Sequence, residues 1–522
     1  MRTLGFTACI FFGLSCLSAR AQGGIELTWG PAPDRSVTQV LTEVFLCDSA
    51  AFCAITSDGK RDAVFTLHRF ETDSMRRTAS RVLSLPDAEG RQAFFLEPLR
   101  FGNRAFILAT TEDEGGEDIY FYAYTVDREF LFPDPPHYLG KVNRSVMVQG
   151  KYYDFVVSEE GGHMAFIASA EPDNKRNEKF TVRLFDRGFD FISEKDLEVP
   201  YPSGEMTHGS VLLDGDRAVW FLKDVPSTRL IESEKVSAYA RDFILLKYNF
   251  HNNALTEKAL SIGTKWIYEA RLAKNEAGHI QVFGYYSNMI DPVMAGTFSV
   301  AFHAETGATT ESGLSSFDRA LKARFRSAGG AADRPDLALF HLNRAFPMRD
   351  NHMLMVSEKI DVFRSTVFNP ATGTYFTVEN YAYEEILLTR ISPSGQGLSF
   401  AKIPKFQNAS RSDETHLSYA AHARDGEILL LYNDHERNAG LDVRSEGKYS
   451  NLSGRNSAQA VMVRYSPDGD LKKHVLFKNS PSGGVLSPRF TLETPVGLVL
   501  YTEGHSGGQF VHLSLGSEGE SE

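Results

Sequence analysis

Cysteine is scarce in this chain, with only four among 522 residues. Two of them fall within the first 16 residues, which leaves Cys47 and Cys53 for the rest of the chain. A metal site needs more ligands than the segment around this pair offers. The 15 histidines form no HExxH motif and no pair with the spacing of zinc ligands. We therefore expect neither a bound metal nor a cofactor.

Clustered positive charge and long apolar runs are also missing. The chain has 55 Lys and Arg against 67 Asp and Glu, a formal net charge of −12, and its basic residues form no stripe. Phosphate neutralisation needs clustered Lys and Arg, so nucleic acid is a poor candidate partner. After residue 21 no stretch is apolar enough to cross a bilayer, which takes about 20 residues. We expect no transmembrane segment in the mature chain.

The first 21 residues have the features of a secretory signal peptide. Arg2 makes the start positive, residues 4–17 are apolar, and Ala19-Arg20-Ala21 is a small-x-small cleavage site before Gln22. Lipidation at Cys16 is the alternative, although the residues before it match a lipidation signal poorly. We expect an exported protein located in the periplasm, on the outer membrane or outside the cell.

Cys47 and Cys53 flank a short polar turn in the segment VFLCDSAAFCAITSDG. The apolar run on each side predicts a hairpin whose thiols face each other near its tip. Outside the cytoplasm such a pair usually forms a disulfide. Two buried free thiols are the alternative.

Aromatic residues and glycine are abundant, with 38 Phe, 20 Tyr and 42 Gly, which favours strands joined by turns. One pattern recurs: two strands around a tight turn, a variable loop, then two strands around a turn that usually contains glycine. The clearest copies span 154–199, 269–314 and 416–477. Looser copies span about 40–85, 92–140, 208–262 and 338–404, and an incomplete one spans 485–516.

Units of this kind, repeated every 45–65 residues, are typical of four-stranded blades. We predict an all-β fold, a single β-propeller domain over 22–522 with eight blades, or seven because the 338–404 unit is irregular. The strand IELTWG at 25–30 could supply the strand that the last unit lacks and so close the ring. Phe317, Leu321 and Phe325 predict a short helical insertion at about 316–334. A pair of β-sandwich domains and an open solenoid are the alternatives.

Several short motifs resemble a group of uncharacterised secreted proteins of Gram-negative bacteria. The motifs are Trp29-Gly30-Pro31, YAYEEILLTRISPSG at 381–395 followed by Ile403-Pro404-Lys405 and Gln407, Asn433-Asp434 with Arg437-Asn438, and Gly454-Arg455-Asn456-Ser457. Relatives tend to carry Trp where this chain has Phe400. The resemblance implies a propeller-like fold and export, and it implies no activity.

Motifs with catalytic associations are weak. The G-x-S-x-G match at 504–508 lacks the strand-turn-helix context of a nucleophile elbow and is better explained as a hairpin turn. The acidic run at 112–118 could offer oxygen ligands to Ca²⁺, but solvated hairpin loops commonly look the same. Asn433, Asp434, Arg437 and Asn438 begin a long loop and are our candidate ligand contacts, with loop capping as the alternative.

These observations predict a binding or scaffold propeller of the cell envelope, whose partner is a protein or a glycan. The alternative is a glycan hydrolase or lyase that uses carboxylates at the mouth of the central channel. The segments 171–179, 224–241, 361–380 and 433–457 are predicted to be long loops between the second and third strands of their blades. Because loops carry function more often than tight turns do, we expect a partner to dock on their face.

Overall fold

The computed structural model describes most of the chain. The residues it describes are 18–21, 25–31, 40–60, 63–145, 153–170, 177–200, 211–232, 237–288, 293–325, 337–370, 373–410, 414–424, 426–444, 449–478, 483–504 and 507–515. The predicted signal peptide lies outside the described residues, except for β1 (Ser18–Ala21).

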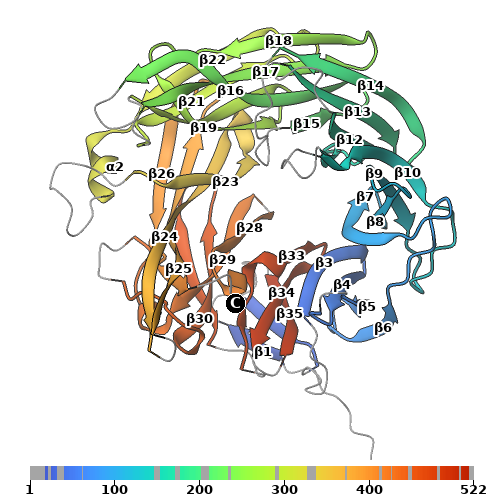
Figure 1. Ribbon diagram of the computed structural model, residues 1–522. Coiled ribbons are helices and arrows are strands. Elements are labelled where there is room, and N and C mark those ends of the chain that lie inside the picture. Colours follow the sequence, from blue (N-terminus) through green and yellow to red (C-terminus); the bar gives the residue numbers. More distant parts are fainter. Residues whose placement is uncertain are drawn as a thin grey trace, which may run out of the picture.

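Eight antiparallel sheets, each built on four strands, are arranged in a ring, which is the architecture of a β-propeller (Figure 1). The fold predicted from the repeat is confirmed, with eight units. Sheets 1 to 3 contain β3 (Val40–Asp48), β4 (Ala51–Ser57), β5 (Phe65–Glu71) and β6 (Arg77–Val82); β7 (Phe94–Phe101), β8 (Arg104–Glu112), β9 (Asp118–Thr125) and β10 (His137–Asn143); and β11 (Tyr153–Val157), β12 (His163–Ala170), β13 (Glu178–Asp186) and β14 (Phe191–Val199).

Sheets 4 to 6 follow in the same way. They contain β15 (Val211–Asp214), β16 (Ala218–Glu232), β17 (Ser237–Asn249) and β18 (Ala254–Leu260); β19 (Trp266–Lys274), β20 (Ile280–Ser287), β21 (Gly296–Phe302) and β22 (Thr309–Ser316); and β23 (Phe340–Pro347), β24 (Met353–Asn369), β25 (Thr374–Ile391), β26 (Gly397–Ile403) and β27 (Gln407–Ser410).

Sheets 7 and 8 complete the ring. They contain β28 (Tyr419–Arg424), β29 (Glu427–His435), β30 (Ala458–Tyr465) and β31 (Leu471–Phe477); and β32 (Val485–Leu486), β33 (Leu492–Thr494), β34 (Gly497–Gly504) and β35 (Gly507–Leu515), together with β1 and β2 (Ile25–Trp29).

The middle strands of each sheet are apolar on both faces because a neighbouring sheet covers each face. In sheet 3, the consecutive residues Met164, Ala165, Phe166 and Ile167 of β12 are all buried. Residues of alternating orientation in one strand therefore enter two different cores. Ala165 and Ile167 pack toward sheet 4, whereas Met164 and Phe166 pack toward sheet 2.

Eight apolar clusters, each shared by two neighbouring sheets, form most of the core in the described residues. They include one at the boundary between the last sheet and the first, where Phe52 of β4 packs with Val499 of β34 and Phe510 of β35. The ring therefore has a packed interface at every sheet boundary, including the one that joins its two chain ends.

The N-terminal strand β2 pairs with β35 in an antiparallel register, from Ile25 opposite Leu515 to Trp29 opposite Val511. Its inward side chains Ile25, Leu27 and Trp29 are buried in the core between sheets 7 and 8. Strand β2 thus takes the position that the incomplete last unit leaves open. How far this pairing holds the ring closed stays a prediction, for which a test is given below.

The disulfide between Cys47 and Cys53 is present, with 5.7 Å between the two Cα atoms. The two residues lie on the β3–β4 hairpin, as predicted. In the segment predicted as a helical insertion, helix α2 (Arg319–Arg324) begins after Asp318, whose carboxylate accepts from the Leu321 amide. Phe317, Leu321 and Phe325 are buried against sheets 5 and 6.

Two of the four predicted loops are wrong. Residues 224–241 and 361–380 belong largely to long hairpins, β16–β17 and β24–β25. In the second, β-branched and aromatic residues such as Val367, Phe368 and Phe376 favour strands strongly, and Gly373 with positive φ completes the turn. In the other two segments, residues 171–176 and 445–448 lie outside the described residues.

Candidate functional site

The first strands of the sheets lie toward the centre of the ring (Figure 1). They contact one another between sheets 1 and 2, 3 and 4, 4 and 5, and 5 and 6. Because successive strands alternate in direction, the ring has two distinct faces. We call the face with the links between sheets and the second-to-third strand connections the connection face. We call the opposite one, with the tight hairpin turns, the turn face. Each first strand runs from the connection face toward the turn face.

Three carboxyl groups from the first strands of sheets 1, 2 and 3 influence one another electrostatically near the ring centre. Glu43 belongs to β3, Glu97 to β7 and Asp154 to β11. Glu97 reaches solvent, yet the surrounding protein raises its pKa by desolvation, and the negative charges of Glu43 and Asp154 raise it further. Glu43 and Asp154 are therefore both near enough to Glu97 to act on its pKa, although the three residues come from separate sheets.

Burial and nearby charges also shift the pKa values of Glu43 and Tyr153. Burial raises the pKa of Glu43, and the guanidinium of Arg489 opposes that rise. Burial also raises the pKa of the Tyr153 hydroxyl, with Glu97 and Asp154 adding to it. Glu43 and Glu97 are the fourth residues of their strands and Asp154 is the second, so the cluster lies nearer the connection face. The sequence signal for it is an acid between apolar residues in each first strand, a signal that our sequence interpretation did not use.

Across the ring centre, charged groups of sheet 5 are engaged with the backbone of sheet 6. Glu269 accepts from the Leu342 amide at 2.7 Å, and Arg271 donates from Nε and Nη2 to the Leu342 carbonyl at 2.9 and 2.7 Å. Leu342 precedes a bulge in β23, where strand pairing shifts register. Burial raises the pKa of Glu269, and the Leu342 amide opposes it. This pair fastens two sheets together, which leaves the Glu43, Glu97 and Asp154 cluster as the candidate site.

The residues predicted as ligand contacts lie at the end of β29, and three of the four are buried. Asn433 Nδ2 donates to the carbonyls of His416 and Leu486, each at 2.7 Å. Its side chain thereby links the segment before sheet 7 to sheet 8. A ligand could not reach this amide without displacing those bonds.

Asp434 and Asn438 order the connection that follows β29. The Asp434 carboxylate pairs with Lys473 at 2.7 Å and accepts from Asn438 Nδ2 at 2.7 Å. Asn438 Nδ2 also donates to the Ser450 carbonyl, which anchors the far side of the connection. Of the predicted contacts, Arg437 is the exposed one. Ligand binding at these residues stays a prediction.

Two further residues of the motifs, Lys405 and Gln407, belong to the same buried network. Lys405 Nζ pairs with Glu358 Oε1 at 2.7 Å, and both side chains are completely buried. Gln407 Oε1 accepts from Lys405 Nζ at 3.0 Å, while its Nε2 donates to the Asn433 carbonyl at 2.7 Å. The network runs from sheet 6 through sheet 7 to sheet 8. These contacts give the motif residues a structural role in joining blades.

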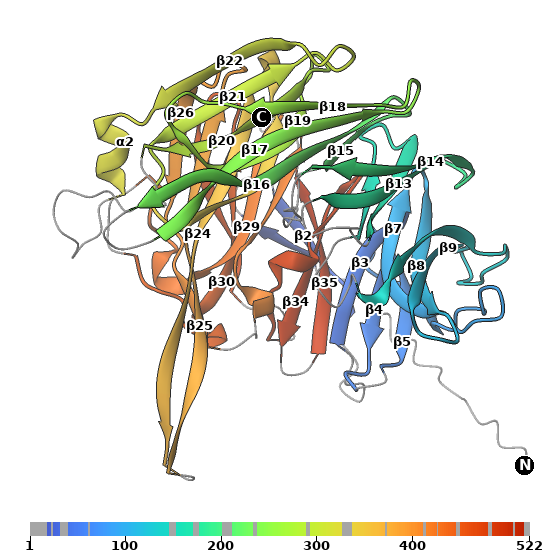
Figure 2. The same cartoon turned by 45° about the horizontal axis from the view of Figure 1, so that its top comes forward.

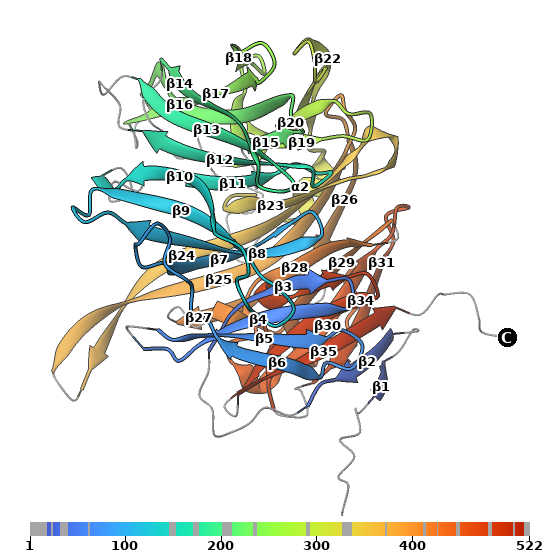
Figure 3. The same ribbon diagram turned by 90° about the vertical axis from the view of Figure 1, so that its right-hand side faces the viewer.

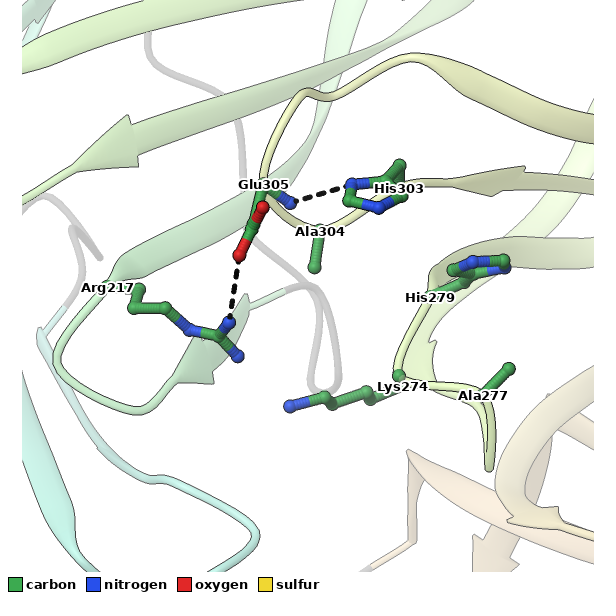
Figure 4. Close-up of a pocket in the computed structure, with 8 residues that line it drawn as sticks. Arg217, Lys274, Ala277, His279, His303, Ala304 and Glu305 are labelled. Carbon is green, nitrogen blue, oxygen red and sulfur yellow. Dashed lines mark hydrogen bonds and ion pairs between the residues drawn. The ribbon is translucent and has the colours of Figure 1, made fainter.

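A pocket of about 300 Å³ lies on the turn face between sheets 4 and 5 (Figure 4). Arg217 and Lys274 point into it, and both pair with the buried Asp214, at 3.1 and 2.6 Å. Glu305 lies 3.9 Å from Arg217, on the opposite wall. The pocket's cations are thus largely neutralised by neighbouring acids, and it lies on the face opposite the carboxyl cluster.

The remaining sequence motifs acquire no chemistry from the structure. The match at 504–508 falls on the β34–β35 hairpin, with 505 and 506 outside the described residues. In the part of the chain that the structure describes, no three His, Cys, Asp or Glu side chains are grouped so as to hold a metal ion. Within that same part, helices of the length and apolarity needed to cross a bilayer are absent.

Comparison with known proteins supports no family assignment. No protein-family model and no curated protein matches the chain. Among solved structures, the β-propeller domain of the Trilobed protease from Pyrococcus furiosus is 9% identical, with a TM-score of 0.33 over 70% of this chain and 97% of that one. The WD40 domain of SCAP from fission yeast is 7% identical, with a TM-score of 0.28 over 97% and 99%.

An oligogalacturonate lyase in complex with manganese is 9% identical, with a TM-score of 0.35 over 96% of each chain. Likenesses this distant carry no functional argument. The assignment to the β-propeller fold follows from the topology of the eight sheets.

Proposed function

We propose that this protein is an exported binding propeller of the cell envelope, which takes a glycan or a protein segment at the connection face of the ring. The observation that carries the proposal is the position of Glu43, Glu97 and Asp154 on three neighbouring first strands, where Glu43 and Asp154 both act on the pKa of Glu97. The long β24–β25 hairpin and the connection after β29 lie on the same face. Ligand sites of repeat folds commonly use such a concentration of polar groups and connections.

The cluster can present hydrogen-bond donors and acceptors side by side. A protonated carboxyl group donates a hydrogen bond, whereas a carboxylate only accepts. Because its surroundings raise the pKa of Glu97, this group keeps its proton to a higher pH than an ordinary glutamate does. The Tyr153 hydroxyl lies in the same environment. This combination suits the hydroxyl groups of a sugar or the amides of a peptide.

The test is capture by a panel of neutral and acidic oligosaccharides and by envelope fractions. The variant Glu97→Gln/Asp154→Asn keeps the side-chain shapes and replaces both ionisable carboxyl groups by neutral amides. We expect it to weaken capture at least tenfold, while Glu311→Gln, on the exposed outer strand β22, leaves it unchanged. Equal capture by the unmodified protein and both variants would show that the binding site is not at the ring centre.

Export has its own test, because it rests on residues 1–21. Mass spectrometry of protein recovered from the producing cell should find Gln22 at the N-terminus. A chain that begins at a diacylated Cys16 would show lipid anchoring in place of simple cleavage.

A glycan hydrolase or lyase is the second candidate, favoured by the raised pKa of Glu97 next to another carboxyl group. In such enzymes one carboxylic acid protonates the leaving oxygen and a second, about 5–9.5 Å away, acts as nucleophile or base. Glu97 would be the acid and Asp154 its counterpart. Release of new sugar ends, lost in Glu97→Gln while binding persists, would establish this role. Binding without any release would leave the first proposal standing alone.

A further inference from the structure

The hairpin β24–β25 extends well beyond its sheet. Its partner strand β23 stops pairing at Lys359, and β26 stops at Ile386, but β24 and β25 continue to pair with each other as far as Asn369 opposite Thr374. We call residues 361–380 the arm. Figures 2 and 3 show it projecting alone from the ring, on the side of the connection face. Among the described strands, only β27 pairs with the arm, at its base through Asn380.

Large apolar side chains are exposed on both faces of the arm. Phe368 and Tyr375, opposite each other on one face, are 49% and 72% exposed, and their rings lie 5.1 Å apart. Val367 and Phe376, opposite each other on the other face, are 41% and 40% exposed. Exposed apolar groups concentrated in this way mark a surface that meets a partner.

The outer part of the arm carries no charge. Arg364 and Glu379 form an ion pair across the two strands at 2.9 Å, and residues 365–378 between them contain no Asp, Glu, Lys or Arg. From this ion pair to the turn the arm spans five residues, or about 17 Å at the usual rise per residue of a strand. The outer part of the arm therefore carries two cross-strand pairs of apolar side chains next to its turn and no charged residue.

The apolar residues cover both faces of the outer arm, and this distribution determines what kind of partner fits. A protein groove usually covers one face, and edge pairing with a second copy would leave both apolar faces in water. A lipid layer covers all sides at once. The outer edges of a two-stranded hairpin retain backbone groups that need hydrogen bonds, which forbids deep entry into hydrocarbon. At the interface, about 5–10 Å into the headgroup and upper acyl region, water and headgroups can still satisfy them.

We infer that the arm is an interfacial membrane anchor, whose outer residues Val367, Phe368, Tyr375 and Phe376 insert into a lipid surface. Aromatic side chains are favoured at that depth. The arm has no net charge in its outer part and the whole chain carries −12, so no attraction to anionic lipid is expected. The lipid partner is therefore a neutral, zwitterionic surface, and the arm holds the acidic ring away from it.

The experiment is co-flotation of the full chain with phosphatidylcholine vesicles. Phe368→Ser/Tyr375→Ser removes the aromatic pair on exposed strands, and it should reduce the vesicle-bound fraction at least tenfold without changing the melting temperature. The matched control is Phe191→Ser/Ile192→Ser, which removes two side chains of similar exposure from the outer strand β14. It should float like the unmodified protein, and so should Glu97→Gln/Asp154→Asn, which separates this proposal from the one for the ring centre.

Two results would overturn the inference. One is that the unmodified chain stays unbound, or that the arm variant floats equally well. The other is that light scattering detects a dimer that the arm variant abolishes while vesicles capture neither protein, which would assign the arm to a second copy of the chain.

Discussion

Lys405 and Glu358 form a buried ion pair in sheet 6, at its boundary with sheet 7. Lys405 and Glu358 have no solvent exposure, and the Ser418 hydroxyl donates to the other oxygen of Glu358 at 2.6 Å. Removing one partner of such a pair leaves an uncompensated charge, which costs about 3–5 kcal/mol. Lys405→Met should therefore lower the free energy of unfolding by that amount in denaturant titration. Lys60→Met, in a surface pair with Asp58, should change it by about 0–1 kcal/mol. Similar losses in both would contradict a role for burial.

The carboxyl cluster should make stability depend on pH. The folded state raises the pKa of Glu97 and of Glu43, so the folded protein binds more protons than the unfolded chain as these groups titrate. Their contribution to stability is complete below about pH 4.5 and is lost as pH rises through the raised values. Glu97→Gln should therefore stabilise the protein more at pH 7 than at pH 4, as measured by denaturation midpoints. An equal effect at both pH values would show that folding does not raise the pKa of Glu97.

The sequence identified residues that matter, but it did not reveal which contacts they make. The sequence singled out Asn433 and Lys405, but their partners Leu486 and Glu358 are distant in the chain, and no local pattern connects them. The pairings depend on how neighbouring sheets stack. The acids at the ring centre were likewise visible in the sequence as single residues. Only the ring brings Glu43 and Glu97 together.

At the scale of elements, the sequence predicted the hairpins that have tight turns, but it did not predict the hairpins that have long strands. Gly161, Gly278 and Gly469 adopt positive φ in turns that the repeat pattern located, because glycine takes this conformation without steric cost. The arm carries Ser, Thr, Arg and Glu among its apolar residues, and this mixture resembles a polar loop. Along its outer part, the two strands of the arm pair only with each other among the described strands. The periodicity of the sequence does not reveal this arrangement.

Strand β2 is the element whose contribution is easiest to isolate. Leu27 is buried between sheets 7 and 8, whereas its neighbour Glu26 is exposed. Leu27→Ala should cost about 2–5 kcal/mol of unfolding free energy, and Glu26→Ala should cost little. Deleting residues 22–31 should go further and expose the edge of β35, which promotes aggregation. A truncated protein that melts and stays dispersed like the full chain would show that β2 does not close the ring.

At the scale of the whole molecule, the unbroken series of interfaces should make unfolding cooperative. In an open repeat array each unit contacts only its neighbours, so the ends can unfold separately. Here sheet 8 also packs on sheet 1, and no sheet is terminal. Loss of one sheet would expose the apolar surfaces of two neighbours at once. We therefore expect one transition in calorimetry.

Alanine substitutions at two well-separated sheet boundaries test whether the ring unfolds in one transition. Phe298 is buried between sheets 4 and 5, and Leu431 between sheets 7 and 8. Phe298→Ala should cost about 3–5 kcal/mol and Leu431→Ala about 2–5 kcal/mol, and each should shift the same single transition downward. Because the sites share no contacts, the double variant should lose the sum of the two within about 0.5 kcal/mol. If either variant instead splits the transition in two, the blades near that boundary unfold independently, and the ring does not behave as one cooperative unit.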